Sequence, residues 1–140
     1  MHTRGCFIAL LVIVSAWLGV SPAEGAGFDG SVPILCATTR IIECDSVSDC
    51  EETTLESVDL PRFFKIDLAK KSMYGINAIG QKMAKETSIK SVQRADGKLM
   101  LQGVQVRAWS LLLSEETGNM TLTASDEEAA FVLFGACTIP

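Results

Sequence analysis

The sequence contains one histidine, His2, which lies in an N-terminal stretch that we expect to be cleaved off. Without histidine, the remaining chain cannot perform Ser-His-Asp or Cys-His catalysis. It also cannot form a histidine-ligated zinc or copper site. We therefore expect no catalytic residues of these kinds, no metal, no cofactor and no enzymatic activity.

A second long apolar run is also missing. The first, Phe7–Val20, follows Arg4 and precedes the small residues Ser21, Ala23 and Gly25. It is shorter than the roughly 20 residues needed to cross a bilayer, and the arrangement is typical of a secretion signal. We expect residues 1–25 to be a cleaved signal peptide. Residues 26–140 should form a single β domain with no transmembrane segment, located in the periplasm or secreted.

The predicted mature chain has four cysteines but no Cys-x-x-Cys pair: Cys36, Cys44, Cys50 and Cys137. An even number of cysteines in an oxidising compartment favours structural disulfides, and four cysteines allow three pairings. Cys44 and Cys50 flank a short turn, so we expect them to pair. Cys36 and Cys137 lie in apolar segments near the two ends, which a barrel or sandwich would bring together.

Short strands separated by turns dominate the pattern. Apolar and polar residues alternate in Phe64–Leu68 and Met120–Ser125, and Asp96-Gly97 is a strong hairpin signal. We predict an all-β fold: a small antiparallel barrel or sandwich of six or seven strands in a meander, stapled by disulfides. Further strands are expected at 33–44, 88–94, 98–104, 107–114 and 129–137. The last is apolar on both faces, which predicts a strand covered on both sides.

Helical content is expected in two places. Thr53 and Glu56 have capping-box spacing, which predicts one helical turn over 54–58. Ile76, Ile79 and Met83 have helical spacing, although two glycines nearby weaken that interpretation. A mobile basic loop over 69–86 is the alternative.

Charge is unevenly distributed. The formal net charge is −5, and residues 26–61 are strongly acidic while residues 62–98 are strongly basic. An acidic, extracytoplasmic protein is not expected to bind nucleic acid. An anionic partner would be bound by the basic segment, through Lys70, Lys71, Lys82 and Lys85. The alternative is a solvated surface whose lysines are balanced by the acids of residues 43–59.

Other candidate sites are weaker. The acids around Cys44–Cys50 lack the spacing of a calcium loop, so no metal site is expected. Glu115-Glu116 and Glu127-Glu128 leave a carboxylate-dependent hydrolase as an alternative, but both pairs lie in predicted turns. Trp109 is expected to pack in the core or to line a ligand pocket. Asn119 begins a glycosylation sequon, Asn-Met-Thr.

Several of these features form one layout: Leu35-Cys36, the acidic loop from Cys44 to Cys50, Trp109-Ser110, Thr117-Gly118 and Phe134-Gly135-Ala136-Cys137. This layout resembles small uncharacterised secreted proteins of Gram-negative bacteria. It is loosely similar to the periplasmic inhibitors of C-type lysozyme, which are small β-barrels with a disulfide between an early strand and the last one. The inhibitory Ser-Gly loop of those inhibitors has no counterpart here.

These observations favour a non-enzymatic binding domain for a small hydrophobic ligand or an envelope protein partner. A structural or assembly protein of the cell envelope is the alternative.

Overall fold

A computed structural model describes residues 27–47 and 49–140 of the chain. The predicted signal peptide, residues 1–25, lies outside the described residues. Within the described ranges, the regular structure consists of β-strands joined by turns, and no helix is long and apolar enough to cross a membrane. The all-β prediction is confirmed.

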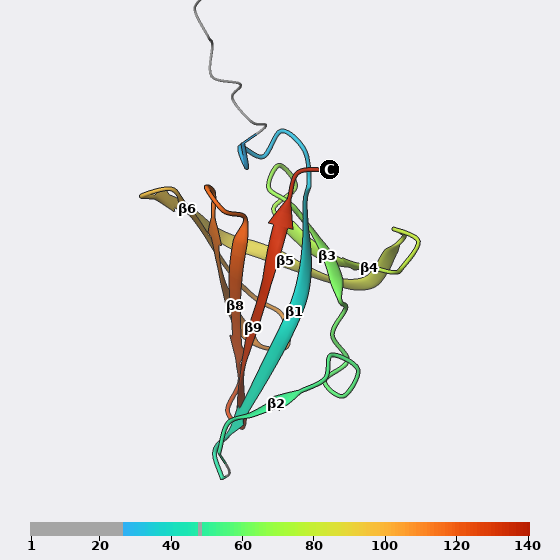
Figure 1. The fold of residues 1–140 in the computed structure, drawn as a ribbon, viewed down its shortest axis with the longest axis vertical. Coiled ribbons are helices and arrows are strands. Elements are labelled where there is room, and N and C mark those ends of the chain that lie inside the picture. Colours follow the sequence, from blue (N-terminus) through green and yellow to red (C-terminus); the bar gives the residue numbers. More distant parts are fainter. Residues whose placement is uncertain (1–26, 48) are drawn as a thin grey trace, which may run out of the picture.

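The strands form one antiparallel sheet that closes into a barrel (Figure 1). Eight strands make the barrel, in the order β1-β3-β4-β5-β6-β7-β8-β9, and pairing between β9 and β1 closes it. A ninth strand, β2, extends the sheet beside β1. The strands are β1 (Ile34–Asp45), β2 (Glu51–Thr53), β3 (Phe63–Asp67), β4 (Ser72–Ile76), β5 (Lys82–Ala95), β6 (Lys98–Val104), β7 (Ala108–Ser114), β8 (Asn119–Ser125) and β9 (Ala129–Thr138).

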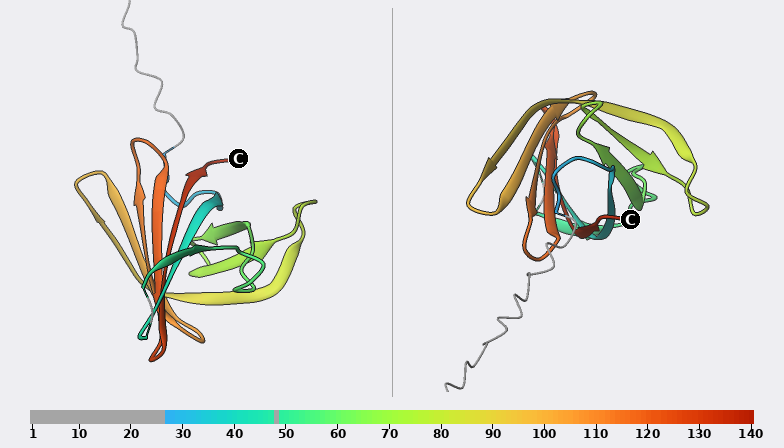
Figure 2. Two further views of the ribbon diagram at one scale, coloured as in Figure 1. Left: turned by 60° about the horizontal axis from the view of Figure 1, so that its bottom comes forward. Right: turned by 90° about the horizontal axis from the view of Figure 1, so that it is seen from above.

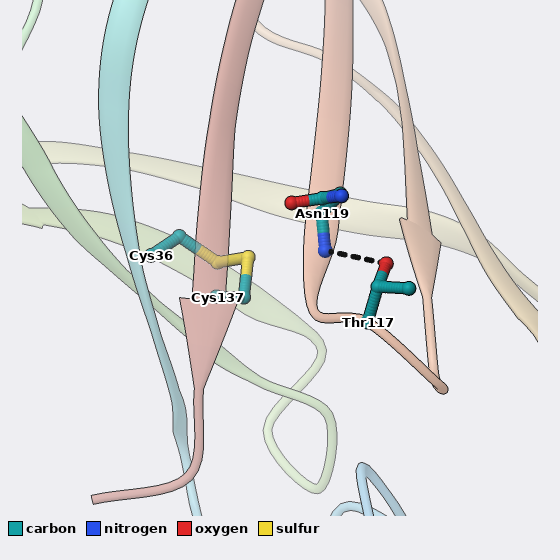
Figure 3. Close-up of a disulfide and its surroundings, with 4 residues drawn as sticks. All are labelled: Cys36, Thr117, Asn119 and Cys137. Atoms are coloured by element: carbon teal, nitrogen blue, oxygen red, sulfur yellow. Dashed lines mark hydrogen bonds between the residues drawn. A yellow bond between two sulfur atoms is a disulfide. The ribbon is translucent and has the colours of Figure 1, made fainter.

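Strand β1 holds the barrel together. Its whole length pairs with β9, its first part pairs with β3, and its later part pairs with β2. Cys36 and Cys137 face each other in the β1–β9 register and form a disulfide (Figure 3). Cys44 and Cys50 form the second disulfide, which links the end of β1 to the start of β2. These are the two pairs that the sequence favoured.

The predicted number of strands was too low. The sequence predicted six or seven, whereas the described residues contain nine. The difference lies mainly in residues 51–53 and 69–86. In residues 69–86, β4 and the first part of β5 replace the expected helix or mobile loop. The side chain of Asn77 shapes the turn between these strands, because its Oδ1 accepts hydrogen bonds from the amides of Ile79 and Gln81 at 3.1 and 2.9 Å.

Two further local predictions were wrong. A helical turn was predicted over 54–58, whereas residues 55–59 form consecutive turns, and the amide of Leu60 closes them on the carbonyl of Leu55 at 2.9 Å. Strand β9 is not covered on both faces. Phe131 and Leu133 point into the barrel, whereas Phe134 is 38 % exposed on the outside.

The barrel interior is fully packed towards one end. Leu99, Leu101, Leu111 and Leu113 on β6 and β7 have no exposed surface. That end carries the Asp96-Gly97 turn, and the N-terminal segment and the C-terminus lie near it, with Phe28 and Ile139 packed against the core. Strand β5 curves from the β6 side of the barrel to the β4 side (Figure 2). The opposite end of the barrel contains the site described below.

Candidate functional site

A cavity of about 350 Å³ lies at the end of the barrel that carries the β6–β7 turn, and it opens to solvent. Its size falls within the range of small-molecule sites, which starts at about 300 Å³. The side chains and backbone that line it come from β3, β4, β5, β7, β8, β9 and two loops. They are Val58–Pro61, Phe64, Met73–Gly75, Lys85–Thr87, Gln105–Arg107, Trp109, Leu122, Ala124 and Phe131.

Strand register places the apolar wall of the cavity. Trp109 pairs with Ala124, and Ala124 pairs with Phe131, so these three residues lie side by side on the inner face. Phe64 lies on another part of the wall, opposite Gly75 in the β3–β4 register. Aromatic rings therefore enclose the cavity from different strands, a lining suited to an apolar ligand.

Trp109 is both a core residue and a cavity residue. Its side chain is 8 % exposed, and its indole Nε1 donates a hydrogen bond to Thr87 Oγ1 at 3.0 Å. The ring lies on Gly103, where an added Cβ would be 2.3 Å from Trp109 Cζ2. The inner face of β6 thus changes from leucine to glycine at the cavity end, and this change makes room for the indole.

The loop of residues 54–62, here called the cap loop, covers one side of the cavity. Leu55 is buried, and Val58 and Leu60 pack against the core. The ring of Pro61 occupies the space beside Gly75, since a Cβ there would lie 2.8 Å from Pro61 Cγ. The cap loop is therefore an apolar wall, with glycine providing the space for its proline.

An ion pair ties the cap loop to the barrel. Lys85 Nζ on β5 donates to the carbonyl oxygen of Asp59 at 2.5 Å and also pairs with the Asp59 carboxylate. Asp59 has a left-handed backbone, with φ of 52°. The lysine is thus bound to two groups of one loop residue, both at the cavity rim.

The second charged group of the rim is Arg107. Its Nε donates to Asp126 Oδ2 at 2.7 Å, and its guanidinium carbon lies 4.5 Å from the centre of the Phe131 ring. Asp126 Oδ1 accepts hydrogen bonds from the amides of Ala129 and Glu128, both at 2.9 Å. The Ala129 amide is the main cause of a lowered Asp126 pKa, with the Glu128 amide and Arg107 acting in the same direction. Arg107 is therefore held by an ionised carboxylate.

A third rim group, Glu86, is also compensated. Lys82 Nζ binds Glu86 Oε2 at 2.6 Å, and this hydrogen bond is the main cause of the lowered pKa of Glu86. The interior of the cavity is apolar, and its charged groups are confined to the rim and paired.

The four lysines proposed for anion binding do not form one patch. Lys70 and Lys71 lie in the turn before β4, whereas Lys82 pairs in register with Ile76 at the far end of that strand. Lys70 pairs with Asp67 at 3.2 Å, and Lys82 and Lys85 have the partners given above. Only Lys85 lines the cavity. Anion binding by this segment stays a prediction, and three of its lysines are already ion-paired.

The remaining sequence candidates lie outside the cavity. Neither Glu115-Glu116 nor Glu127-Glu128 lines it, and Glu115 pairs with Arg94. Asn119 is exposed at the start of β8, where its backbone amide donates a hydrogen bond to Thr117 Oγ1 at 3.2 Å (Figure 3). In the part of the chain that the structure describes, no group of three or more His, Cys, Asp or Glu residues is placed to hold a metal ion.

Sequence reasoning identified Trp109 but missed most of the cavity. Phe64 was visible as an inward position of an alternating strand, whereas Phe131 lay in a run read as apolar on both faces. Nothing in the sequence indicated that the two residues share a space with the 54–62 loop. Arg107 was the first residue of the predicted strand 107–114, and no function was predicted for it. Comparison with family models, curated proteins and solved structures finds no match for this chain, so the site is interpreted from its own chemistry.

Proposed function

We propose that this protein binds a small apolar ligand in the mouth of its barrel and has no enzymatic role. The observation that carries the proposal is the solvent-accessible cavity of about 350 Å³, walled by Phe64, Trp109 and Phe131. Burying an apolar ligand there would remove aromatic surface from water, which is favourable by about 25 cal/mol per Å². The absence of histidine beyond His2 supports a binding role rather than acid–base chemistry.

We further propose that the protein works in the periplasm or after secretion. Two disulfides are compatible with an oxidising compartment. A ligand carrier in that compartment would meet apolar molecules of the cell envelope. Native mass spectrometry of protein purified from its own cells would reveal a retained ligand as added mass.

A titration with a defined neutral probe tests the binding function. Trp109 is the only tryptophan after residue 25, so its fluorescence reports on the cavity. We expect 1-decanol to change the emission saturably in the wild type. Ala124→Phe should abolish this change, because Ala124 lines the cavity and the added ring would fill it. Ala130→Phe is the matched control, because Ala130 is exposed on β9 and does not line the cavity.

The proposal fails if 1-decanol produces no saturable change in the wild type. It also fails if Ala124→Phe, shown to be folded by circular dichroism, binds as well as Ala130→Phe. Either result would remove the cavity as the binding site.

A protein partner is the second candidate function. Its support is on the outer face of β7 and β9, where Leu112 and Phe134 are 41 % and 38 % exposed and lie in one row on either side of Thr121. Apolar side chains on a strand's outer face can mark an interaction surface. Replacing both by threonine should then weaken capture of an envelope protein while leaving 1-decanol binding unchanged. Unchanged capture would contradict a partner site on this face.

A further inference from the structure

Arg107 is a cavity residue with unused hydrogen-bonding capacity. A guanidinium has five N–H donors in a planar fork. In the described structure, one of them, on Nε, binds Asp126, and Nη1 and Nη2 have no hydrogen-bond partner. Its guanidinium carbon lies over the ring of Phe131, which is itself part of the cavity wall. Free donors are therefore held at the edge of an apolar space.

The surroundings of Arg107 fix its orientation. Asp126 is anchored by two backbone amides, and it holds the guanidinium through Nε. The guanidinium carbon also lies over the Phe131 ring, 4.5 Å from its centre. Because Nε is already bonded to Asp126, the edge formed by Nη1 and Nη2 is left for a second acceptor.

The other cationic group of the rim differs in this respect. Lys85 is bound to both the carbonyl oxygen and the carboxylate of Asp59, so it serves to hold the cap loop. The rim acids also have partners, Lys82 for Glu86 and Lys85 for Asp59. Arg107 is thus the rim group whose charge-assisted donors remain available to a ligand.

We infer that the ligand is a carboxylate amphiphile. Its carboxylate binds the Nη1–Nη2 edge of Arg107, and its apolar part fills the cavity between Phe64, Trp109 and Phe131. The planar guanidinium fork matches the two oxygens of a carboxylate, and such charge-assisted pairs are among the stronger hydrogen bonds in proteins. This inference rests on the proposed function, since it assigns a head group to the ligand of the same cavity.

The test compares two probes with the same chain, decanoate and 1-decanol, by titration of Trp109 fluorescence below their aggregation concentrations. Wild-type protein should bind decanoate more tightly than 1-decanol. Arg107→Gln should lower decanoate affinity about tenfold and 1-decanol affinity much less, because only decanoate carries the charge that the guanidinium pairs with. Arg107→Lys should recover only part of the loss, because it keeps the charge and loses the fork.

Arg40→Gln is the matched control. Arg40 also binds one carboxylate through Nε, that of Glu52 at 3.0 Å, but it does not line the cavity. Its replacement should change neither affinity. Circular dichroism of each variant shows whether it is folded.

The outcomes separate the two proposals. If both probes bind equally and Arg107→Gln does not discriminate between them, the carboxylate inference is wrong while the apolar site stands. If Arg40→Gln lowers decanoate affinity as much as Arg107→Gln does, a general charge effect replaces the specific contact and the inference also fails. If neither probe binds the wild type, the proposed function itself fails.

Discussion

The close contact between the Trp109 ring and Gly103 gives the most specific stability prediction, which concerns the variant Gly103→Ala. The added Cβ would lie 2.3 Å from Trp109 Cζ2 and 2.5 Å from the carbonyl oxygen of Ser88. Neither distance is tolerable, so the indole must move and the backbone of β5 must shift. Gly103 does not have a positive φ, so the constraint is space rather than backbone conformation.

The magnitude follows from two effects. Forcing a methyl group into a packed position costs about 1–3 kcal/mol, and losing the hydrogen bond from Trp109 Nε1 to Thr87 costs about 1 kcal/mol. We expect Gly103→Ala to lower the free energy of unfolding by about 2–4 kcal/mol. Urea denaturation followed by far-ultraviolet circular dichroism measures this change.

A control variant separates crowding from the general effect of replacing glycine. Gly80 has a φ of +80°, and a Cβ added there would have no neighbouring atom within 4 Å. Gly80→Ala therefore carries only a backbone cost of about 1 kcal/mol. In a Trp109→Leu background, Gly103→Ala should become less costly, because one of its two clashes is gone. The reasoning is refuted if Gly103→Ala is no more destabilising than Gly80→Ala.

Three further predictions concern the stability of the barrel. Replacing both cysteines of the Cys36–Cys137 disulfide by alanine should cost more than replacing both of Cys44–Cys50. The two loops span 101 and 6 residues, for which chain entropy gives about 4.7 and about 2 kcal/mol. Equal losses in urea denaturation would contradict this. Thr38→Val should leave the unfolding free energy unchanged or raise it by about 1 kcal/mol, because the buried Thr38 Oγ1 has no partner in the described structure; a clear loss in the same assay would be inconsistent with that. Asp67 has a lowered pKa, mainly through the Lys70 amide, which donates to it at 2.9 Å. A lowered folded-state pKa stabilises the protein above about pH 4, and this stability is lost as pH falls through the folded-state value. Asp67→Asn should therefore flatten the decline in stability between about pH 5 and pH 2, and an unchanged slope would refute the role of Asp67.

Strands with local signals could be predicted from the sequence. The alternation in 64–68 and 120–125 corresponds to β3 and β8, and Asp96-Gly97 forms the β5–β6 turn with φ of 50° and 68°. Their periodicity and turn chemistry are encoded in a few adjacent residues.

The rest depends on contacts distant in sequence. Gly75 weakened a helical interpretation of 69–86, but its function in the fold is to accommodate Pro61 from the cap loop. The cavity exists because residues from several strands and loops are brought to one end of the barrel. No local sequence pattern indicates such a juxtaposition. Trp109 was recognised by its residue type, whereas the role of Arg107 follows only from its contacts with Asp126 and Phe131.

The central claim is that the cavity beneath the cap loop is the ligand site. Its most direct test is a ¹H–¹⁵N correlation spectrum of residues 26–140 during titration with decanoate. The account predicts saturable shifts of the Trp109 indole N–H signal and of the amides of Gly75, Arg107 and Phe131, which come from different parts of the cavity wall. Shifts confined to the outer face around Leu112 and Phe134, with the Trp109 indole signal unmoved, would contradict it.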